Sequence, residues 1–539
     1  MKTGKTVKVL LTAATAAGML AGCGSKTDTD TFRFASELDI QGMDSTVVDD
    51  GMSFNAIHAI TDGLTAVNEK GKTAPALAKS WDVSDDGKTY TFHLRDAKWS
   101  NGDKVTANDF VYSWRKIIKD AGNYAYMLGN GGASVKNADA LMELGANATD
   151  EQMATLGVTA KDDKTLVVEL ENKVPYFTDL MAFPCYFPQN EKFVEKCGKN
   201  YGTKPEYTLS NGAYTMTKWI KGNKATFTKN DKYYDAKAVK TKNLEMFLVQ
   251  DPKTAAQNFD NGKVDYATIN STLVDKYKGK DTFTTFNEGY LFYLQLNFKN
   301  NTVANKNVRE ALAYAINRKD LCENVLKDGS MAATGFVPSQ LSTSPAGRDF
   351  RDDADKYVSY DQKKAQEYLD AAKKELGTDT ITIDLLYGTD ESPMDTMAEY
   401  LQGSFTKLKG LKVNMVATVK KDRIYNREAN GNFQVVCTRW GPDYADPTTY
   451  LNLATTDNSN NYGKYTNAKY DALMEQIQKE SDLTKRWDLM IQAEKVMMED
   501  MAYIPVFEKG SAALKAKNVK GLVVVPVGTP YTFKYVKLK

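Results

Sequence analysis

Histidine is almost absent from this sequence of 539 residues, and that scarcity restricts the chemistry the chain can perform. The two histidines, His58 in an apolar stretch and His93 in an alternating strand pattern, are interpreted as core or surface residues. Two imidazoles do not readily supply a histidine-rich metal site or a histidine-based catalytic triad. GxSxG and HExxH motifs are also missing, so we expect no metal site, no cofactor and no catalytic residues.

Cysteine is scarce as well and shows no CxxC spacing. Besides Cys23, which belongs to the N-terminal segment, the chain contains Cys185, Cys197, Cys322 and Cys437. In an extracellular setting these four could form disulfides, with Cys185 and Cys197 as the most local pair, but one sequence does not define the connectivity. Of these alternatives we favour free, buried thiols.

Neither sign of charge dominates, because 70 lysines and arginines face 69 acids. Removal of residues 1–22, which hold three lysines and no acid, would leave a net charge near −2. This balance excludes the basic footprint of a nucleic-acid-binding protein. Lysine-rich stretches such as 237–242 are interpreted as solvated surface.

Only the N-terminus carries a long apolar run, and it has the layout of a bacterial lipoprotein signal. Three lysines precede the run 9–20, and Leu20-Ala21-Gly22-Cys23 forms a lipobox. The run is too short to span a bilayer. We therefore predict a signal peptide at 1–22, diacylglycerol on the Cys23 thiol and a lipidated linker at 23–31. The alternative is an ordinary secretory signal with a chance cysteine.

The length exceeds what one hydrophobic core usually supports, so we expect two or three domains with a cleft between them. Strands and helices are mixed without strict alternation, which predicts an α+β or mixed α/β fold. Strands are expected from Phe32 and over 88–94, and helices over 53–61, after the N-cap Thr106, over 307–317 and over 489–497.

Distinctive multi-residue blocks follow one another along the chain. They are Pro75–Trp81, Tyr90–Arg95, Lys98–Gly102, Thr106–Trp114, Ser210–Tyr214, Asn307–Asp320 and Trp440–Thr448. In this order they resemble the oligopeptide-binding protein family, the substrate-binding lipoproteins of peptide ABC transporters (solute-binding protein family 5). The resemblance covers nearly the whole mature chain, and several ordered blocks are more specific than one short motif.

The resemblance implies a two-lobe periplasmic-binding-protein fold with a hinge, of type II cluster C, with an extra inserted domain. We expect the first lobe at 32–53, 176–290 and 510–539, the inserted domain at 54–175 and the second lobe at 291–509. The lobes would close on an extended peptide. A receptor that tolerates many sequences should hold what peptides share, which is the backbone and the charged termini.

The resemblance also implies which residues bind the peptide. Asp443 would pair with the α-ammonium group, because a desolvated carboxylate is costly unless it is paired. The alternative is that Asp443 caps the turn before Pro447, a role that we assign to Asp446 instead. Trp440 would form a wall of the cleft and Tyr124 would line it.

Four weaker candidates are as compatible with packing as with ligand contact. They are Glu37, Asn211, Gly212 and Tyr214. By contrast, the tryptophans of the early blocks are interpreted as packing residues. They are Trp81, Trp99 and Trp114.

The residue that meets the peptide's C-terminus is left open by the resemblance. Pro393 and Cys437 stand where enterobacterial members of the family use basic residues and a histidine. Arg439 and Arg427 are near in sequence, and either guanidinium could bind a carboxylate. The alternative is that Arg423, Arg427 and Arg439 form surface ion pairs, and this is the interpretation that we favour for Arg423.

Together these inferences predict a monomeric receptor, not an enzyme, that binds oligopeptides and delivers them to the permease and ATPase of an ABC importer. Anchoring through Cys23 places it on the extracytoplasmic face of the cell membrane, and a Gram-positive surface is expected because no periplasm would retain a free protein. A specialised cargo, such as a signalling or cell-wall peptide, is the main alternative. A lipid-anchored hydrolase that recruits acidic pairs such as Asp85 and Asp86 is the remote one.

Overall fold

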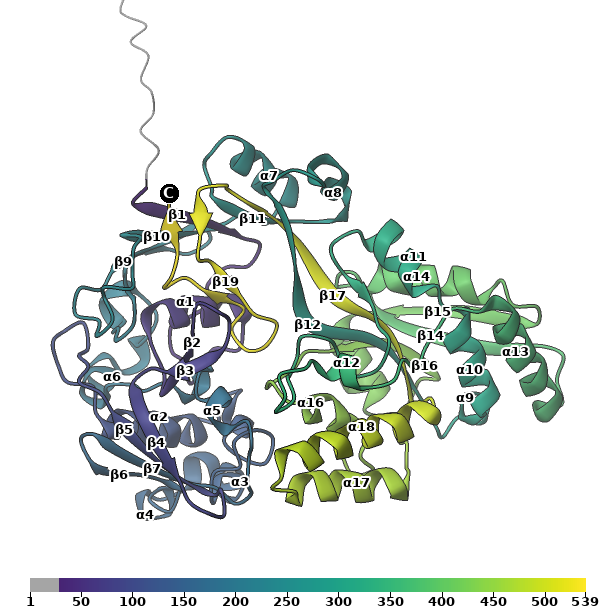
Figure 1. The fold of residues 1–539 in the computed structure, drawn as a ribbon, viewed down its shortest axis with the longest axis horizontal. Coiled ribbons are helices and arrows are strands. Elements are labelled where there is room, and N and C mark those ends of the chain that lie inside the picture. Colours follow the sequence, from purple (N-terminus) through teal and green to yellow (C-terminus); the bar gives the residue numbers. More distant parts are fainter. Residues whose placement is uncertain (1–28) are drawn as a thin grey trace, which may run out of the picture.

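The structure is a computed structural model that describes residues 29–539. The predicted signal peptide and Cys23 lie outside the described residues, so the lipobox stays a prediction. Within the described part, no helix combines the length and the apolar character that a membrane crossing requires. Strands and helices form two bodies connected by a pair of long strands (Figure 1). The predicted mixed α/β fold with two lobes is therefore confirmed.

A single mixed sheet of eleven strands runs through both bodies. Its centre is the antiparallel pair β12 (Phe283–Leu296) and β17 (Tyr503–Lys515), its two longest strands. The strands on one side, which belong to the first lobe, are β11 (Tyr266–Ile269), β1 (Thr31–Ser36), β10 (Asn243–Leu248), β9 (Lys224–Lys229) and β8 (Tyr214–Ile220). Those on the other side, which belong to the second lobe, are β16 (Val435–Trp440), β14 (Ile381–Gly388) and β15 (Leu411–Thr418). Off this path, β13 (Met331–Ala332) pairs with β17.

The connecting strands are interrupted by a bulge between the lobes. Asn287 lies opposite Gly510 and Leu291 lies opposite Glu508, so three residues of β12 face one residue of β17. A bulge bends a strand pair and increases its twist, which lets one sheet serve two separate bodies. The predicted lobe boundaries, after residues 290 and 509, fall within this bulge, and their exact positions stay a prediction.

A small domain packs beside the first lobe and falls within the predicted insertion. Its antiparallel sheet consists of β4 (Ala78–Val83), β5 (Thr89–Leu94), β7 (Thr165–Glu169) and β6 (Val158–Asp162). Helix α2 (Ala107–Lys119) begins as predicted after Thr106, whose backbone N–H donates to Asp109 Oδ2 at 2.8 Å. Trp99 and Trp114 are fully buried in this domain, as expected for packing residues.

Helices cover the sheets in each body. In the first lobe and small domain they are α1 (Gly51–Ile60), α3 (Ala138–Leu144), α4 (Asp150–Met153), α5 (Phe177–Leu180), α6 (Glu191–Cys197), α7 (Pro252–Asp260) and α8 (Ser271–Tyr277). In the second lobe they are α9 (Asn301–Ala304), α10 (Lys306–Ala315), α11 (Arg318–Asp320), α12 (Phe350–Asp353), α13 (Gln362–Leu376), α14 (Met394–Phe405), α15 (Lys420–Asp422), α16 (Thr448–Leu451), α17 (Ala468–Lys479) and α18 (Leu483–Glu499). The helices expected over 53–61, 307–317 and 489–497 are thus confirmed as α1, α10 and part of α18.

Short strand pairs complete the architecture. They are β2 (Thr65–Val67) with β3 (Thr73–Pro75), β18 (Val519–Lys520) with β21 (Lys537–Leu538), and β19 (Val523–Val524) with β20 (Tyr531–Thr532). The four described cysteines are free, and three of them are buried, as predicted; Cys197 is partly exposed.

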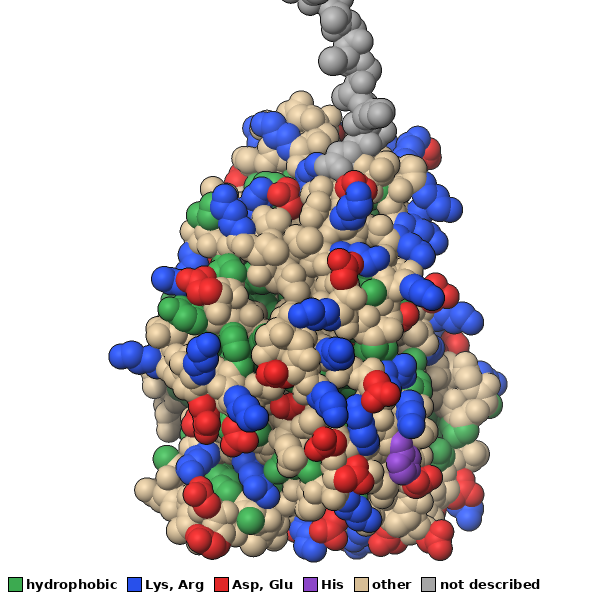
Figure 2. All heavy atoms as spheres, turned by 90° about the vertical axis from the view of Figure 1, so that its left-hand side faces the viewer, with side chains coloured by type: hydrophobic (Ala, Val, Ile, Leu, Met, Phe, Trp, Pro, Cys, Tyr) green, Lys and Arg blue, Asp and Glu red, His purple; other side chains and the backbone are tan. Residues whose placement is uncertain are grey.

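The surface of the first lobe and small domain carries both signs of charge. Figure 2 shows lysine and arginine side chains interspersed with acids across this face rather than gathered by sign. The near balance of basic and acidic residues in the sequence is therefore seen on this face as a surface of mixed charge.

Candidate functional site

A cavity of about 270 Å³ lies between the two lobes. The first lobe and small domain contribute residues of 58–73, 179–183 and 525–529, and the second lobe contributes 340–343 and 443–445. An interlobe cavity is a common place for a small-molecule or peptide site, because both lobes can surround the ligand. The predicted cleft is therefore present, and Asp443 lines it.

Asp443 follows β16 in a loop of the second lobe. Its backbone N–H donates to Thr449 Oγ1 at 3.2 Å, and its Oδ1 accepts a long bond of 3.4 Å from the Tyr126 hydroxyl. Within residues 29–539 no basic side chain forms an ion pair with it. Burial raises the pKa of this carboxyl to about 6, against the smaller opposing effect of the Tyr126 hydrogen bond. This carboxylate is therefore suited to a cation that arrives with the ligand.

Aromatic rings of the first lobe and small domain face Asp443. The Tyr124 ring lies 5.7 Å from that of Tyr126 and 5.3 Å from that of Phe183, which also lines the cavity. Burial, followed by the negative charge of Asp443, raises the pKa of both tyrosines, so both hydroxyls remain protonated donors. Tyr124 is not among the residues that line the cavity but lies beside Phe183, which does, and its predicted role stays a prediction. Tyr126 was missed, since it is 317 residues from Asp443 and carries no local signal.

The loop that holds Asp443 is fixed by its neighbours. Asp446 Oδ1 accepts from the Thr448 N–H at 3.0 Å, and its carboxylate accepts two bonds of 2.6 and 2.9 Å from Arg486. Burial would raise the pKa of Asp446, but Arg486 and the hydrogen bonds hold it below its ordinary value. Tyr444 stacks on Tyr176 of the opposite body with ring centroids 4.1 Å apart. The capping role predicted for Asp446 is confirmed. The Asp443 carboxylate is therefore not needed as the cap of this turn.

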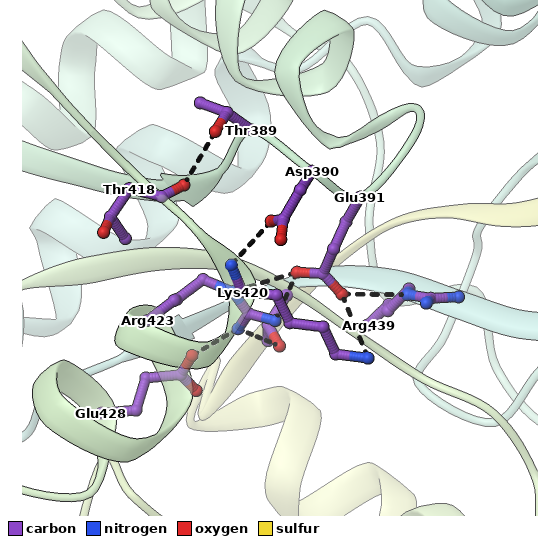
Figure 3. A network of polar contacts seen from close by, with 9 residues as sticks. Thr389, Asp390, Glu391, Thr418, Lys420, Arg423, Glu428 and Arg439 are labelled. Carbon is purple, nitrogen blue, oxygen red and sulfur yellow. Dashed lines mark hydrogen bonds and ion pairs between the residues drawn. The ribbon is translucent and has the colours of Figure 1, made fainter. Parts of the chain in front are cut away.

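A second cavity of about 240 Å³ lies at the other end of the segment 440–443, within the second lobe. Trp440 and Arg439 both line it, at the end of β16. The Arg439 guanidinium lies 4.9 Å from the Tyr290 ring centroid, and its Nε is 3.4 Å from Glu391 Oε1. Figure 3 shows Arg439, from β16, and Lys420, from the start of α15, approaching Glu391. Trp440 and Arg439, which were predicted to bind the peptide together with Asp443, therefore line this second cavity and not the cavity between the lobes.

The interpretation of Arg423 as a surface residue is wrong. Its side chain is only 2% exposed and binds Glu391 at 2.8 Å, Glu428, and Thr438 Oγ1 at 2.9 Å. A guanidinium can be buried when carboxylates pair with it, and the two partners lie 32 and 5 residues away in sequence. Arg427, in contrast, is 45% exposed, pairs with Asp422 at 3.4 Å and lines neither cavity.

The four weaker candidates do not line either cavity. Asn211 Oδ1 accepts from the Asp62 N–H at 2.8 Å, Gly212 N–H donates to Ile60 O at 2.8 Å, and Tyr214 is buried in the first-lobe core. These contacts attach β8 to the end of α1, so packing accounts for them. Glu37 is exposed after β1 and accepts from Thr268 Oγ1 at 3.3 Å.

Neither of the two positions considered for the peptide's C-terminus reaches a cavity. Cys437 is fully buried in β16 and lies opposite Leu294 of β12. Pro393 precedes α14. The basic groups of the second cavity come instead from Arg439, Lys420 and Arg423, and Lys72 is the basic residue among those that line the interlobe cavity.

Comparisons with known proteins agree on one family. Residues 72–462 match the family described as bacterial extracellular solute-binding proteins, family 5. A dipeptide-binding protein of Lactococcus lactis is 34% identical, with all of both chains covered. Listeria monocytogenes OppA bound to peptide has a TM-score of 0.74 and 34% identity, covering 95% of this chain and 99% of its own. The pheromone receptor PrgZ has a TM-score of 0.75 and 31% identity with the same coverage.

These matches extend over both lobes and the small domain. They confirm the predicted resemblance and the two-lobe fold, and they confirm the prediction of a binding protein over the hydrolase, since the matched family consists of solute-binding proteins. The ordered blocks, the interlobe cavity and the comparisons lead to one assignment. The chain belongs to family 5 of the bacterial extracellular solute-binding proteins.

Proposed function

We propose that this protein binds oligopeptides in the cavity between its lobes and delivers them to a peptide importer of the ABC type. The observation that carries the proposal is the partly buried carboxylate of Asp443, which lines the interlobe cavity and forms no ion pair with a basic residue of the described chain. A peptide α-ammonium would supply that partner. The names of the relatives, a dipeptide-binding protein and a peptide-bound OppA, support the same class of ligand.

The surrounding residues suit a ligand whose sequence varies. Tyr124 and Tyr126 supply aromatic surface around the ammonium site, and the Tyr126 hydroxyl donates to Asp443. Trp440 and Arg439 line the neighbouring cavity of the second lobe, from which they would supply a wall for the peptide backbone and a cation beyond it. Closure of the lobes would then exclude water from the Asp443–ammonium pair and strengthen it.

Lipid anchoring is part of the proposal. Acylation of Cys23 would hold the protein, as a monomer, on the outer face of the cell membrane, where a Gram-positive cell needs a tether for a receptor. Because the match to PrgZ is as extensive as that to OppA, a signalling peptide is the second candidate cargo. A cell-wall peptide is a further candidate cargo.

The proposal is tested by calorimetric titration of the protein with trialanine and with N-acetyl-trialanine. We expect trialanine to bind and acetylation to weaken binding by about 30-fold or more, because loss of a buried charge partner costs about 2–5 kcal/mol. Asp443→Asn should remove this difference, whereas Asp488→Asn, at an exposed position of α18, should preserve it. Equal affinity of the unaltered protein for both peptides would contradict the ammonium role of Asp443.

A further inference from the structure

The bulge between the lobes contains an ion cluster built around one lysine. Lys509 of β17 is the single residue that lies opposite the three bulged residues of β12, and Glu288 is the first of those three. The Lys509 ammonium lies 2.8 Å from Asp328 Oδ2 and also donates to the Gly510 carbonyl. Its distance to Glu288 Oε1 is 3.8 Å. The ammonium therefore has one close carboxylate, one close carbonyl and a second carboxylate just beyond hydrogen-bond distance.

Asp328 holds the ammonium beside β17. It belongs to a loop of the second lobe, and its Oδ1 accepts from the Ser330 N–H at 3.0 Å. The Ser330 hydroxyl oxygen accepts in turn from the Gly510 N–H at 3.0 Å. A Cβ on Gly510 would lie only 2.1 Å from the Gly329 carbonyl carbon, so the loop and β17 are in backbone contact. The side chains of Asp328 and Lys509 are 12% and 15% exposed, and their pair is thus fixed to β17.

Glu288, in contrast, lies in a segment that both bodies hold. The neighbouring Gly289 carbonyl accepts a hydrogen bond from the Tyr450 hydroxyl of the second lobe. On the first-lobe side, a Cβ on Gly289 would lie 2.1 Å from the Pro526 carbonyl oxygen, so these two backbones are in contact. A rotation of one lobe against the other therefore displaces the segment 288–290. The distance from Glu288 to the ammonium changes with it.

The ammonium has a donor to spare for Glu288. It carries three N–H groups, of which Asp328 and Gly510 take two. The Glu288 side chain is 31% exposed, so its carboxylate can move toward Lys509 without crossing a packed core. A decrease of the 3.8 Å distance by about 1 Å would form a charge-assisted hydrogen bond. A lobe angle that brings the two groups together is stabilised by that bond.

We propose that the ion pair of Lys509 with Glu288 forms at one lobe angle and opens at another, and so biases the angle between the lobes. Asp328 acts as a positioning residue, since it competes for the same ammonium and keeps it beside β17. The conformation of this structure is the one in which Asp328 is the main partner. Packed bodies favour discrete arrangements, so we expect the lobes to populate two angles. The inference concerns how the lobes move and does not depend on the ligand that they bind.

The test measures the distance between two nitroxide labels, one on each body, by pulsed electron paramagnetic resonance. Glu151→Cys in α4 and Gln478→Cys in α17 provide exposed sites for the labels. A Cys197→Ser background is used, because Cys197 is the described thiol that is partly exposed. The mature protein without Cys23 carries these changes, so the labels attach at the two chosen sites.

Two substitutions in the ion cluster should shift the lobes in opposite directions. Glu288→Gln should increase the population at the distance of this structure by about 2- to 5-fold relative to the other population, as expected for one partly exposed ion pair. Asp328→Asn should decrease it by a similar factor, because the ammonium is released to Glu288. The control is Asp281→Asn, since Asp281 pairs with Lys517 at 2.6 Å on the exposed surface of the first lobe. It should leave the ratio of the two populations unchanged.

Shifts of both variants in the same direction, or a distance that neither variant changes, would overturn the proposal. If Asp328→Asn folds poorly, 1 M sodium chloride supplies a second test, because salt screens the partly exposed Glu288. Salt should shift the unaltered protein in the same direction as Glu288→Gln does, and it should not shift that variant further. An equal effect of salt on both proteins would contradict the ion pair. Because these measurements use no peptide, a failure of the proposed function would leave their outcome unaffected.

Discussion

Replacement of Asp443 by asparagine should stabilise the empty protein at neutral pH while it weakens peptide binding. Burial raises the pKa of this carboxyl from 3.8 to about 6 in the folded protein. The folded state therefore holds the proton more tightly than the unfolded state. The stability gained by protonation is fully present below about pH 4 and is lost as pH rises through 6.

The size of the effect follows from this shift. A change of about 2 pKa units corresponds to about 3 kcal/mol, which is an upper limit, since Asp443 keeps some contact with solvent. At pH 7.5 we expect Asp443→Asn to raise the free energy of unfolding by about 1–3 kcal/mol. At pH 4 the two proteins should be nearly equal. Asn is nearly isosteric and its oxygen can still accept from the Tyr126 hydroxyl.

The assay is urea unfolding followed by far-UV circular dichroism at pH 4 and 7.5, without peptide. Asp488→Asn, at an exposed site of α18, is the matched control and should change stability by less than about 0.5 kcal/mol at either pH. If Asp443→Asn is less stable than the unaltered protein at pH 7.5, then the carboxylate has a favourable partner in the empty protein. That result would refute its description as a site that awaits a cation.

The remaining predictions concern pH, packing and anchoring. Affinity for peptides with a free amine should rise between pH 5 and 7, because Asp443 ionises in this range, and should fall above about pH 8, because the ligand amine loses its proton. Calorimetry that shows no pH dependence would count against an ion pair between Asp443 and the ligand amine. Arg423→Met should lower the free energy of unfolding by about 3–5 kcal/mol, because Glu391 and Glu428 stay buried without their partner, and a loss under 1 kcal/mol in urea unfolding would contradict this. Gly212→Ala should also destabilise, since a Cβ there would lie 2.7 Å from the Ile60 carbonyl carbon; an unchanged unfolding midpoint would show that β8 can shift. Cys23→Ala should release the protein from the membrane fraction of the expressing cells, and acylated protein still found there would contradict the lipobox.

Local patterns in the sequence predicted the elements well. The helix after Thr106 begins where its cap residue and the acid three positions later place it, and the amphipathic spacing over 307–317 marks α10. Both signals act within one or two turns of a helix. The pairing of β12 with β17, some 200 residues apart, has no such local signal and was not predicted.

The candidate site was predictable where a motif carries it. The block that contains Asp443 and Trp440 identified the segment along which both cavities lie. Tyr126 and Lys420 were missed, because each reaches the site through the folding of a distant segment. Arg423 was misjudged for a related reason, since charged residues in a polar stretch suggest a surface until a partner such as Glu391 is known.

Some residues of the motif blocks have packing roles that the sequence does not reveal. Asn211 and Gly212 stand in a block typical of the family, yet their contacts run to Asp62 and Ile60 at the end of α1. A sequence pattern does not distinguish a residue required for ligand contact from one required for close approach of two backbones. Only the arrangement of side chains around the cavities separates these cases.

Native mass spectrometry of the purified mature protein, without Cys23, tests the central claim most directly, with release and sequencing of whatever co-purifies. The account predicts a set of short peptides with free amino groups, and their loss from the Asp443→Asn variant. A single non-peptide species, or an empty protein that does not respond to a peptide mixture, would contradict a peptide receptor and would require another ligand for the cavity around Asp443.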